Sequence, residues 1–302
     1  MPWPAYLALH QRGELEGRAE AAERLLEACR VCPRECLAQR LQGETGTCGV
    51  ADKAMVSSYG PRSGEDRPLV GFGGSGTIFL AHCNLCCVFC QNFEISQKGE
   101  GQIVSIRELA QMMLNLQRVG CHNINFVTPT HQVPQILRAL LIAVEGGLQV
   151  PLVYNCGGYE SLETLRILDG VFDIYMPDFK YADADVAKRY SKVENYPDVA
   201  RAAFREMHRQ VGDLEIDRRG IARRGLLVRH LVLPNNLAGT GEVVRFLAEL
   251  SKNTYVNIMD QYRPCYRAHE YPALARRPMR AELEEALRLA RAAGLHCLDG
   301  YC

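Results

Sequence analysis

The sequence predicts an α/β protein whose core is a partial (β/α)6 barrel. Short apolar segments of strand length recur along the chain, and amphipathic segments with helical spacing lie between them. A polar turn, or a turn marked by Gly or Pro, follows each apolar segment. The chain has 302 residues, a length that a single α/β barrel commonly reaches.

The expected strands are the apolar segments with turns on both sides. Parallel β/α units place their catalytic groups on the loops at the carboxyl ends of the strands, so these ends are where we look for chemistry. The six segments are 76–82, 123–128, 150–156, 172–179, 226–233 and 255–261.

Three helices follow from periodicity and end signals. Segment 105–120 opens with Ser105 and Glu108 in the spacing of a capping box. Segments 240–250 and 281–293 also place their apolar residues on one face. A long charged connection over 181–225 is interpreted as a solvated helix and loop, with an arginine-rich insertion that docks a partner as the alternative.

The composition excludes several classes of protein. Hydrophobic residues make up 47% of the chain and charged residues 23%, which is typical of a globular protein with a large core. Because 35 Lys and Arg balance 35 Asp and Glu, a nucleic-acid partner is not expected. The sequence contains no apolar run of about 20 residues, and its start, Met1-Pro2-Trp3-Pro4, lacks a signal-peptide pattern. We therefore expect a cytoplasmic protein without a membrane partner.

The loop after the first expected strand carries Cys83, Cys87 and Cys90 in a C-x3-C-x2-C spacing. Three thiolates can hold three irons of a cubane cluster and leave the fourth iron open, whereas an electron-transfer cluster normally uses four cysteines. An open iron implies a small-molecule ligand. The alternative is a zinc knuckle completed by His82 or Cys86, although zinc sites usually pair their ligands on two C-x2-C arms.

Four more cysteines lie near the N-terminus in a C-x2-C-x3-C-x11-C spacing. Their thiolates would form a closed site for structural zinc or for a fully ligated auxiliary iron–sulfur cluster, and the spacing does not choose between them. We expect this site to fasten a small Cys-rich cap, residues 1–60, onto a barrel core formed by residues 61–302. The four residues are Cys29, Cys32, Cys36 and Cys48.

The loop from Cys83 to Cys90, with the aromatic Phe89 directly before the last cysteine, resembles the signature of the radical S-adenosylmethionine (SAM) superfamily. The resemblance implies a [4Fe–4S] cluster whose open iron binds SAM, and one-electron cleavage of SAM to methionine and a 5′-deoxyadenosyl radical. Further segments resemble the branch homologous to pyruvate formate-lyase activating enzyme. They are 68–71, 74–79, 127–131, 154–158, 176–180 and 231–236.

One departure from that branch concerns the amino group of SAM. The activating enzymes carry a Gly-Gly-Glu-like stretch where this chain has Thr128-Pro129-Thr130. Hydroxyls and backbone carbonyls can also accept from an ammonium group, so we expect Thr128 and Thr130 to contribute to SAM binding.

The remaining candidate residues follow strand ends. Asn155 can hydrogen-bond a ribose hydroxyl, and Pro234 begins a turn expected to lie over the adenine, although both segments could be ordinary turns. Asp178 and Lys180 are two residues apart on a strand, so they share a face and could form an ion pair that orients a carboxylate of substrate or cofactor.

These observations lead to a radical SAM oxidoreductase that resembles a glycyl-radical-enzyme activase and abstracts hydrogen from a glycyl, peptide or small-molecule C–H bond. The resemblance also implies a low-potential electron donor such as flavodoxin or ferredoxin, and a glycyl radical enzyme or a peptide as substrate. The alternative is an iron–sulfur or zinc protein without catalysis, either an electron carrier or a scaffold. SAM binding would discriminate between the two.

Overall fold

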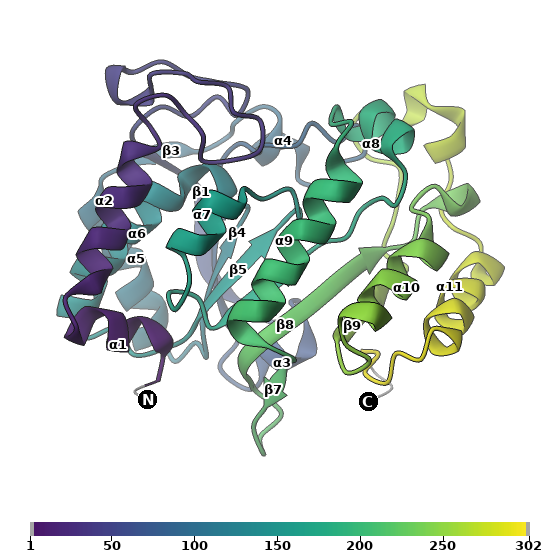
Figure 1. Ribbon diagram of the computed structural model, residues 1–302. Coiled ribbons are helices and arrows are strands. Elements are labelled where there is room, and N and C mark those ends of the chain that lie inside the picture. Colours follow the sequence, from purple (N-terminus) through teal and green to yellow (C-terminus); the bar gives the residue numbers. More distant parts are fainter. Residues whose placement is uncertain (1–2, 300–302) are drawn as a thin grey trace.

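The computed structural model describes residues 3–299, which form an α/β fold around one mostly parallel sheet (Figure 1). Six strands pair in parallel in the order β2-β4-β5-β6-β8-β9, which confirms the predicted partial (β/α)6 barrel. Met1 and Pro2, part of the segment used to argue against a signal peptide, lie outside the described residues. The parallel strands are β2 (Ser75–Leu80), β4 (Ile124–Val127), β5 (Leu152–Cys156), β6 (Ile174–Pro177), β8 (Ala222–Leu231) and β9 (Tyr255–Met259).

Three further strands, which the sequence did not suggest, pair antiparallel beside the six parallel strands. Strand β1 (Ala54–Arg62) lies between β2 and β3 (Gln102–Val104), and β7 (Glu215–Ile216) pairs with β8. They lack a continuous apolar pattern because much of their surface faces solvent. Strand β8 also begins four residues before the expected segment.

Helices flank the sheet, and in Figure 1 α7, α9 and α10 lie in front of β4, β5 and β8. The expected capping box is present at the start of α5, where Ser105 Oγ accepts from the Glu108 amide at 3.2 Å and Glu108 accepts from the Ser105 amide at 2.7 Å. The helices are α1 (Ala5–Gln11), α2 (Glu14–Arg24), α3 (Arg67–Val70), α4 (Phe93–Ser96), α5 (Ile106–Arg118), α6 (Val133–Glu145), α7 (Leu162–Ile167), α8 (Ala184–Ser191), α9 (Tyr196–Val211), α10 (Thr240–Leu250) and α11 (Arg280–Ala292).

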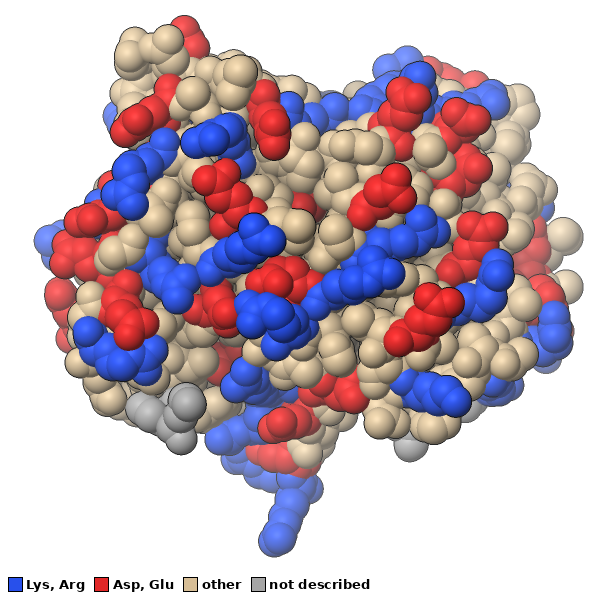
Figure 2. Space-filling view, in the orientation of Figure 1, with Lys and Arg blue, Asp and Glu red and all other residues tan. Residues whose placement is uncertain are grey.

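The charged connection 181–225 is not a solvated segment, and this corrects the expectation. It contains α8, α9 and β7, and α9 packs its apolar face against the sheet, with the rings of Phe204 and Phe179 5.1 Å apart. Its outward face carries the charges that suggested solvation, and Figure 2 shows Lys and Arg interleaved with Asp and Glu over this side of the molecule. Arg218 and Arg219 lie exposed at the tip of the β7–β8 hairpin.

The N-terminal segment is helical, and the two helices α1 and α2 are separated by a break at Gly13, whose φ is +72°. Tyr6 and Leu9 of α1 belong to the main hydrophobic core, and α2 packs against α6. The expected domain boundary at residue 60 falls inside β1, a strand of the sheet. The cysteine-rich loop, residues 25–53, lies at the upper left of Figure 1, above α2.

The interior of the barrel changes from apolar to polar along its strands. Val153, Met176 and Leu227 belong to a small buried apolar cluster. Two residues further along the same strands, and therefore on the same face, come Asn155, Asp178 and Arg229. The carboxyl end of the sheet therefore carries three polar side chains, next to a buried apolar cluster formed by the preceding residues of the same strands. Within residues 3–299, no helix has the length and apolar character needed to cross a membrane.

Candidate active site

A cavity of about 260 Å³ opens at the carboxyl ends of the parallel strands. One wall is the loop after β2, which contributes Cys83, Cys87 and Cys90. The opposite wall consists of residues at or just after the ends of β4, β5, β6, β8 and β9, namely Val127, Thr128, Asn155, Cys156, Gly157, Asp178, Lys180, Arg229, Leu231, Met259 and Gln261. The cysteine loop and the strand-end residues predicted separately from the sequence therefore face one space.

Each of the three cysteine sulfurs has a close polar neighbour. Cys87 Sγ lies 2.9 Å from Ser191 Oγ, Cys90 Sγ lies 3.0 Å from Ser96 Oγ, and Cys83 Sγ accepts from the Leu85 amide at 3.3 Å. Burial raises the pKa of Cys87 to about 11, although the nearby Lys180 lowers it. Metal binding at this loop must therefore displace protons from the thiols.

The chemistry and arrangement of the donor set test which group this loop can hold. Within the described part of the chain, no group of three or more His, Cys, Asp or Glu side chains converges on a position for a single metal ion. Thiolates of one zinc ion all lie about 2.3 Å from it, so the zinc-knuckle alternative finds no support in the structure. Thiolates of a cubane cluster bind separate irons and lie further apart. The donor set on this loop fits a [4Fe–4S] cluster.

A charged network joins three of the strand ends. Lys180 Nζ donates to Asp178 Oδ2 at 2.7 Å, which confirms the predicted ion pair. Arg229 on β8 donates through Nε to Asp178 Oδ1 at 2.9 Å and through Nη2 to Asn155 Oδ1 at 2.7 Å. Burial opposes ionisation of Asp178, but Arg229 and Lys180 outweigh it and hold the pKa of this carboxyl below its usual value. Asp178 is thus a carboxylate that fixes two cations at the cavity wall.

Arg229 is a site residue that the sequence reasoning missed. Its signal was a single charged residue inside the apolar segment 226–233, a position that is costly to bury without a partner. Its second acidic neighbour is Asp66, whose carboxylate lies 4.0 Å away and accepts from Asn257 at 2.6 Å. The partners of Arg229 are 51 to 163 residues distant along the chain, so only the fold brings them together.

Two candidate SAM-binding residues do not line this cavity. Thr130 does not line the cavity, because the chain turns after Pro129 into a short 3-10 helix and the Thr130 hydroxyl donates to buried Glu160 at 2.8 Å. Pro234 is buried, and the neighbouring Asn235 and Asn236 line a separate pocket beside α11. Thr128 does line the cavity.

Thr128 and Phe89 occupy the positions that suit the expected site. Thr128 has a φ of +60° and its amide donates to the Asn155 carbonyl at 2.8 Å, which fixes its backbone at the cavity wall. The Phe89 ring packs edge-on against Tyr181 and Tyr262, with ring centroids 6.3 and 5.8 Å away. These contacts hold an aromatic surface beside the cysteines.

Glu160 is a second residue that the sequence reasoning missed. It is buried behind the cavity wall, where it accepts hydrogen bonds from Thr130 Oγ1 and Tyr154 Oη, both at 2.8 Å. Burial raises the pKa of this carboxyl to about 7, against the opposing effect of its hydrogen bonds. It therefore titrates near neutral pH directly behind Cys156, which lines the cavity.

The N-terminal cysteine loop forms the outer support of the loop that carries Cys83. Arg34 donates from Nε to the Asn84 carbonyl and from Nη1 to the Lys192 carbonyl, both at 2.9 Å. A Cβ atom on Gly49 would lie 2.8 Å from the ring of His82, so the two loops touch closely there. Cys29, Cys32 and Cys48 are buried, and Cys36 is half-buried.

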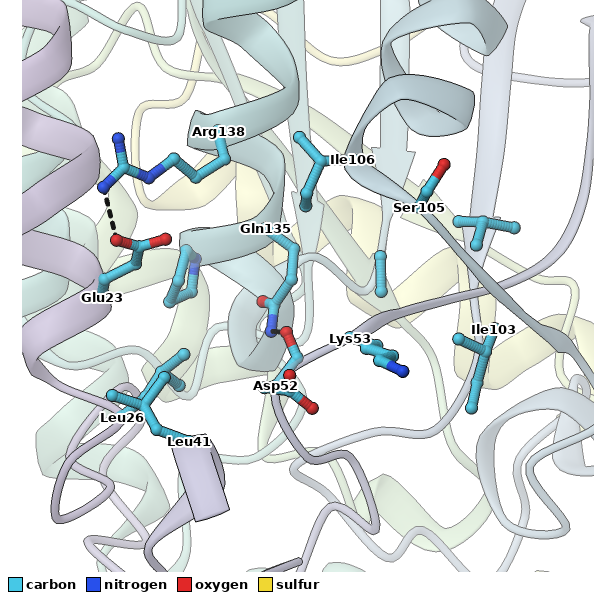
Figure 3. A pocket seen from close by; sticks show the side chains of 13 residues that line it. Glu23, Leu26, Leu41, Asp52, Lys53, Ile103, Ser105, Ile106, Gln135 and Arg138 are labelled. Atoms are coloured by element: carbon cyan, nitrogen blue, oxygen red, sulfur yellow. Dashed lines mark hydrogen bonds and ion pairs between the residues drawn. The ribbon is translucent and has the colours of Figure 1, made fainter. Parts of the chain in front are cut away.

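A second cavity, of about 510 Å³, lies on the flank of the molecule (Figure 3). It is lined by residues of α2, α6 and the β1–β3 edge, and an ion pair between Glu23 and Arg138 closes one side. None of the candidate site residues lines it. We therefore assign the chemistry to the strand-end cavity.

Comparison with known proteins agrees with this geometry. Residues 77–213, which include the cysteine loop and the ends of β4, β5 and β6, match the model of the radical SAM superfamily. The uncharacterized protein MJ0674 of Methanocaldococcus jannaschii is 33% identical over 286 residues, which cover 91% of this chain and 78% of that protein. A second protein of that organism, the uncharacterized MJ0808, is 26% identical over 188 residues, and the match covers 56% of this chain and 54% of MJ0808.

Among solved structures, that of Streptococcus suis SuiB bound to the precursor peptide SuiA aligns with a TM-score of 0.46 and 11% identity. The alignment covers 70% of this chain and 43% of the SuiB chain.

Proposed function

Since this chain belongs to the radical SAM superfamily and to the family of MJ0674, we propose that Cys83, Cys87 and Cys90 hold a [4Fe–4S] cluster that binds and reductively cleaves SAM. The observation that carries the proposal is the shared cavity, with three cysteines on one wall and a polar network on the other. When bound, the reduced cluster supplies the electron for SAM cleavage and hence for radical hydrogen abstraction from a substrate C–H bond.

The polar wall would bind and orient SAM. Arg229 donates a hydrogen bond to Asn155 Oδ1. The NH2 group of Asn155 would then donate to a ribose hydroxyl. The backbone of Thr128 is fixed at the wall, so its hydroxyl and carbonyl oxygens can accept from the SAM ammonium group. Arg229 thus serves as a positioning residue for Asn155.

Lys180 would offset the negative charge that a bound cluster brings to the cavity. Its ammonium is paired with Asp178 and lies near enough to Cys87 to favour the thiolate form of that cysteine. A cluster held by three thiolates adds negative charge to the cavity, and a fixed cation beside it offsets that charge. Asp178 keeps Lys180 in place, so we assign both residues to positioning rather than to proton transfer.

The apolar part of the lining would limit water in the cavity. Leu85, Phe89, Leu231 and Met259 surround the polar groups. Excluding water strengthens the electrostatic contacts inside and protects a reactive species from side reactions.

For the finer assignment we propose an activating-enzyme-like protein that takes hydrogen from a glycyl, peptide or small-molecule C–H bond. The support is the set of strand-end segments that resemble the branch homologous to pyruvate formate-lyase activating enzyme. A low-potential donor of the flavodoxin or ferredoxin class would reduce the cluster, and the cytoplasm would be its compartment. The division into a cap (residues 1–60) and a core (residues 61–302) also stays a prediction.

A spectroscopic experiment separates this proposal from that of a non-catalytic metal protein. The protein is purified anaerobically, its clusters are reconstituted and reduced, and its electron paramagnetic resonance spectrum is recorded with and without SAM. The native protein and a Cys86→Ala control, whose side chain does not line the cavity, should show a SAM-dependent change. The Cys83→Ala/Cys87→Ala/Cys90→Ala variant should show none. A spectrum that SAM leaves unchanged in the native protein would contradict the proposal.

A further inference from the structure

We propose that Cys29, Cys32, Cys36 and Cys48 bind a second iron–sulfur cluster and that the buried guanidinium of Arg40 is its counter-charge. This site is separate from the SAM cavity and does not depend on SAM cleavage. Four observations carry it: the burial of Arg40, the lack of a carboxylate partner for Arg40, the absence of a single-ion arrangement of side chains across residues 3–299, and the packing of Cys36 against Gly46.

Arg40 is a charged side chain with no exposed surface. Its guanidinium donates from Nε and Nη2 to the Ala51 carbonyl, at 3.0 and 2.8 Å, and Nη1 lies 3.7 Å from Cys29 Sγ. Across residues 3–299, no carboxylate forms an ion pair with it. A guanidinium stays protonated in proteins, and a buried charge without an opposite charge is strongly unfavourable.

The group that faces Arg40 can supply the missing negative charge. Cys29 lies at hydrogen-bond distance from the guanidinium, and Cys48 is buried close to both. Four neutral thiols would leave the arginine uncompensated. Thiolates bound to a cluster keep a net negative charge on the site, and Arg40 would then be paired.

One feature favours an iron–sulfur cluster over a single zinc ion. The side chains do not converge on a single-ion position, and the same holds for the superfamily's own cysteine loop. A cubane has a separate iron for each thiolate, so it does not require the thiols to converge on one point.

Gly46 packs so closely against Cys36 that a side chain at residue 46 would displace the Cys36 sulfur. A Cβ atom at this position would lie 2.2 Å from Cys36 Sγ, far inside contact distance. The φ angle of Gly46 is outside the left-handed region, so the obstacle to an alanine there is its contact with Cys36. The absence of a side chain in glycine therefore leaves room for Cys36 Sγ at its present position.

The cluster would stabilise the N-terminal cysteine loop, which packs against the loop that carries Cys83. Arg34 lies between Cys32 and Cys36, and its guanidinium binds the carbonyls of Asn84 and Lys192. A cluster that fixes this short segment at both ends would also fix Arg34 against the loop of Cys83.

The first test uses the full chain with Cys83→Ala, Cys87→Ala and Cys90→Ala, so that any cluster left is the N-terminal one. After anaerobic reconstitution it should retain about four irons and about four sulfides per chain, against about eight of each in the native protein, as two cubanes require. Further replacement of Cys32 and Cys36 by alanine should remove them. Zinc in place of iron, or no bound metal, would overturn the proposal of a second cluster. Neither result would decide whether the native protein cleaves SAM, which is a separate measurement.

The second test examines Arg40 in the same three-alanine background. Arg40→Met should lower the iron content at least several-fold, and any cluster that remains should have a lower reduction potential, because a nearby cation favours the reduced, more negative state. Arg40→Lys should restore most of the iron and the potential, and Arg138→Met is a control on the flank. An Arg40→Met protein with full iron content and an unchanged potential would refute the counter-charge role.

The third test compares two glycines. Gly46→Ala should lose most of the N-terminal iron, whereas Gly17→Ala, in a helix with no atom within 4 Å of the added carbon, should keep it. Gly46→Ala/Cys36→Ser, which replaces the bulky sulfur by a smaller oxygen, should recover thermal stability without recovering iron. Full iron content in Gly46→Ala would show that Cys36 is not a ligand.

Discussion

Replacing Asp178 by Asn should destabilise the protein and disturb the cavity at once. The substitution keeps the shape of the side chain but removes the charge that binds Lys180 at 2.7 Å and Arg229 at 2.9 Å. A hydrogen bond between charged groups contributes about 1.5 to 3 kcal/mol, and the two bonds together set an upper bound of about 6 kcal/mol. Asn can still accept weakly from one cation, and Asp66 remains near Arg229, so we expect a loss of about 2 to 4 kcal/mol at pH 7.

The pH dependence of that loss is a sharper test than its size. Because the pKa of Asp178 is lower in the folded state than in the unfolded chain, the stabilisation is fully present above the unfolded pKa of about 3.9. It declines as the pH falls through the folded pKa, where Asp178 is protonated and resembles Asn. The difference in stability between native protein and variant should therefore shrink in acid.

The measurement is thermal unfolding of both proteins between pH 7 and the lowest pH at which the native protein still folds. Asp198→Asn is the control, since Asp198 forms an exposed ion pair with Arg201 at 3.6 Å and should change stability by about 1 kcal/mol or less. A Asp178→Asn variant as stable as the control at pH 7 would refute the buried network. A loss that did not shrink in acid would refute its electrostatic origin.

Two further predictions concern residues around the cavity. Asn155→Ala should weaken SAM binding by about 1 to 3 kcal/mol, the cost of one lost buried hydrogen-bond partner, and anaerobic equilibrium binding measures it; unchanged affinity would remove Asn155 from the site. Glu160 has a folded pKa of about 7, above its unfolded value of about 4.3, so the folded state binds the extra proton and stability falls as pH rises across that window. Glu160→Gln should reduce this loss of folding stability between pH 5 and pH 8 by up to about 3 kcal/mol, as measured by thermal unfolding at the two pH values. An equally large loss of stability in the variant would contradict the prediction.

The parallel strands and three helices could be predicted because their patterns are long and regular. Six buried strands appear as apolar runs, and the capping box of α5 requires only the local pair Ser105 and Glu108. The antiparallel strands β1, β3 and β7 were not predicted, because their exposed faces break the apolar pattern. Helix α9 was misjudged for a related reason, since its charges are on the outer face of a helix whose other face is buried.

The candidate site was predicted in part. The cysteine loop, Asn155 and the pair Asp178–Lys180 were found because strand ends are visible in the sequence and meet at one edge of a parallel sheet. Thr130 and Pro234 do not line this cavity, because the direction of a side chain in a tight turn depends on backbone angles that the sequence does not specify. Arg229 was missed because its partners are contributed by other strands.

The central claim is that the three-cysteine loop and the strand ends form one SAM-cleaving site, and formation of 5′-deoxyadenosine tests it most directly. Anaerobically reconstituted protein is incubated with SAM and a strong one-electron reductant, and the product is measured by liquid chromatography and mass spectrometry. We predict 5′-deoxyadenosine from the native protein and from Cys86→Ala, and none above background from the variant without Cys83, Cys87 and Cys90. Equal amounts from the native protein and that variant, or none from either while the cluster is present and reduced, would contradict the claim.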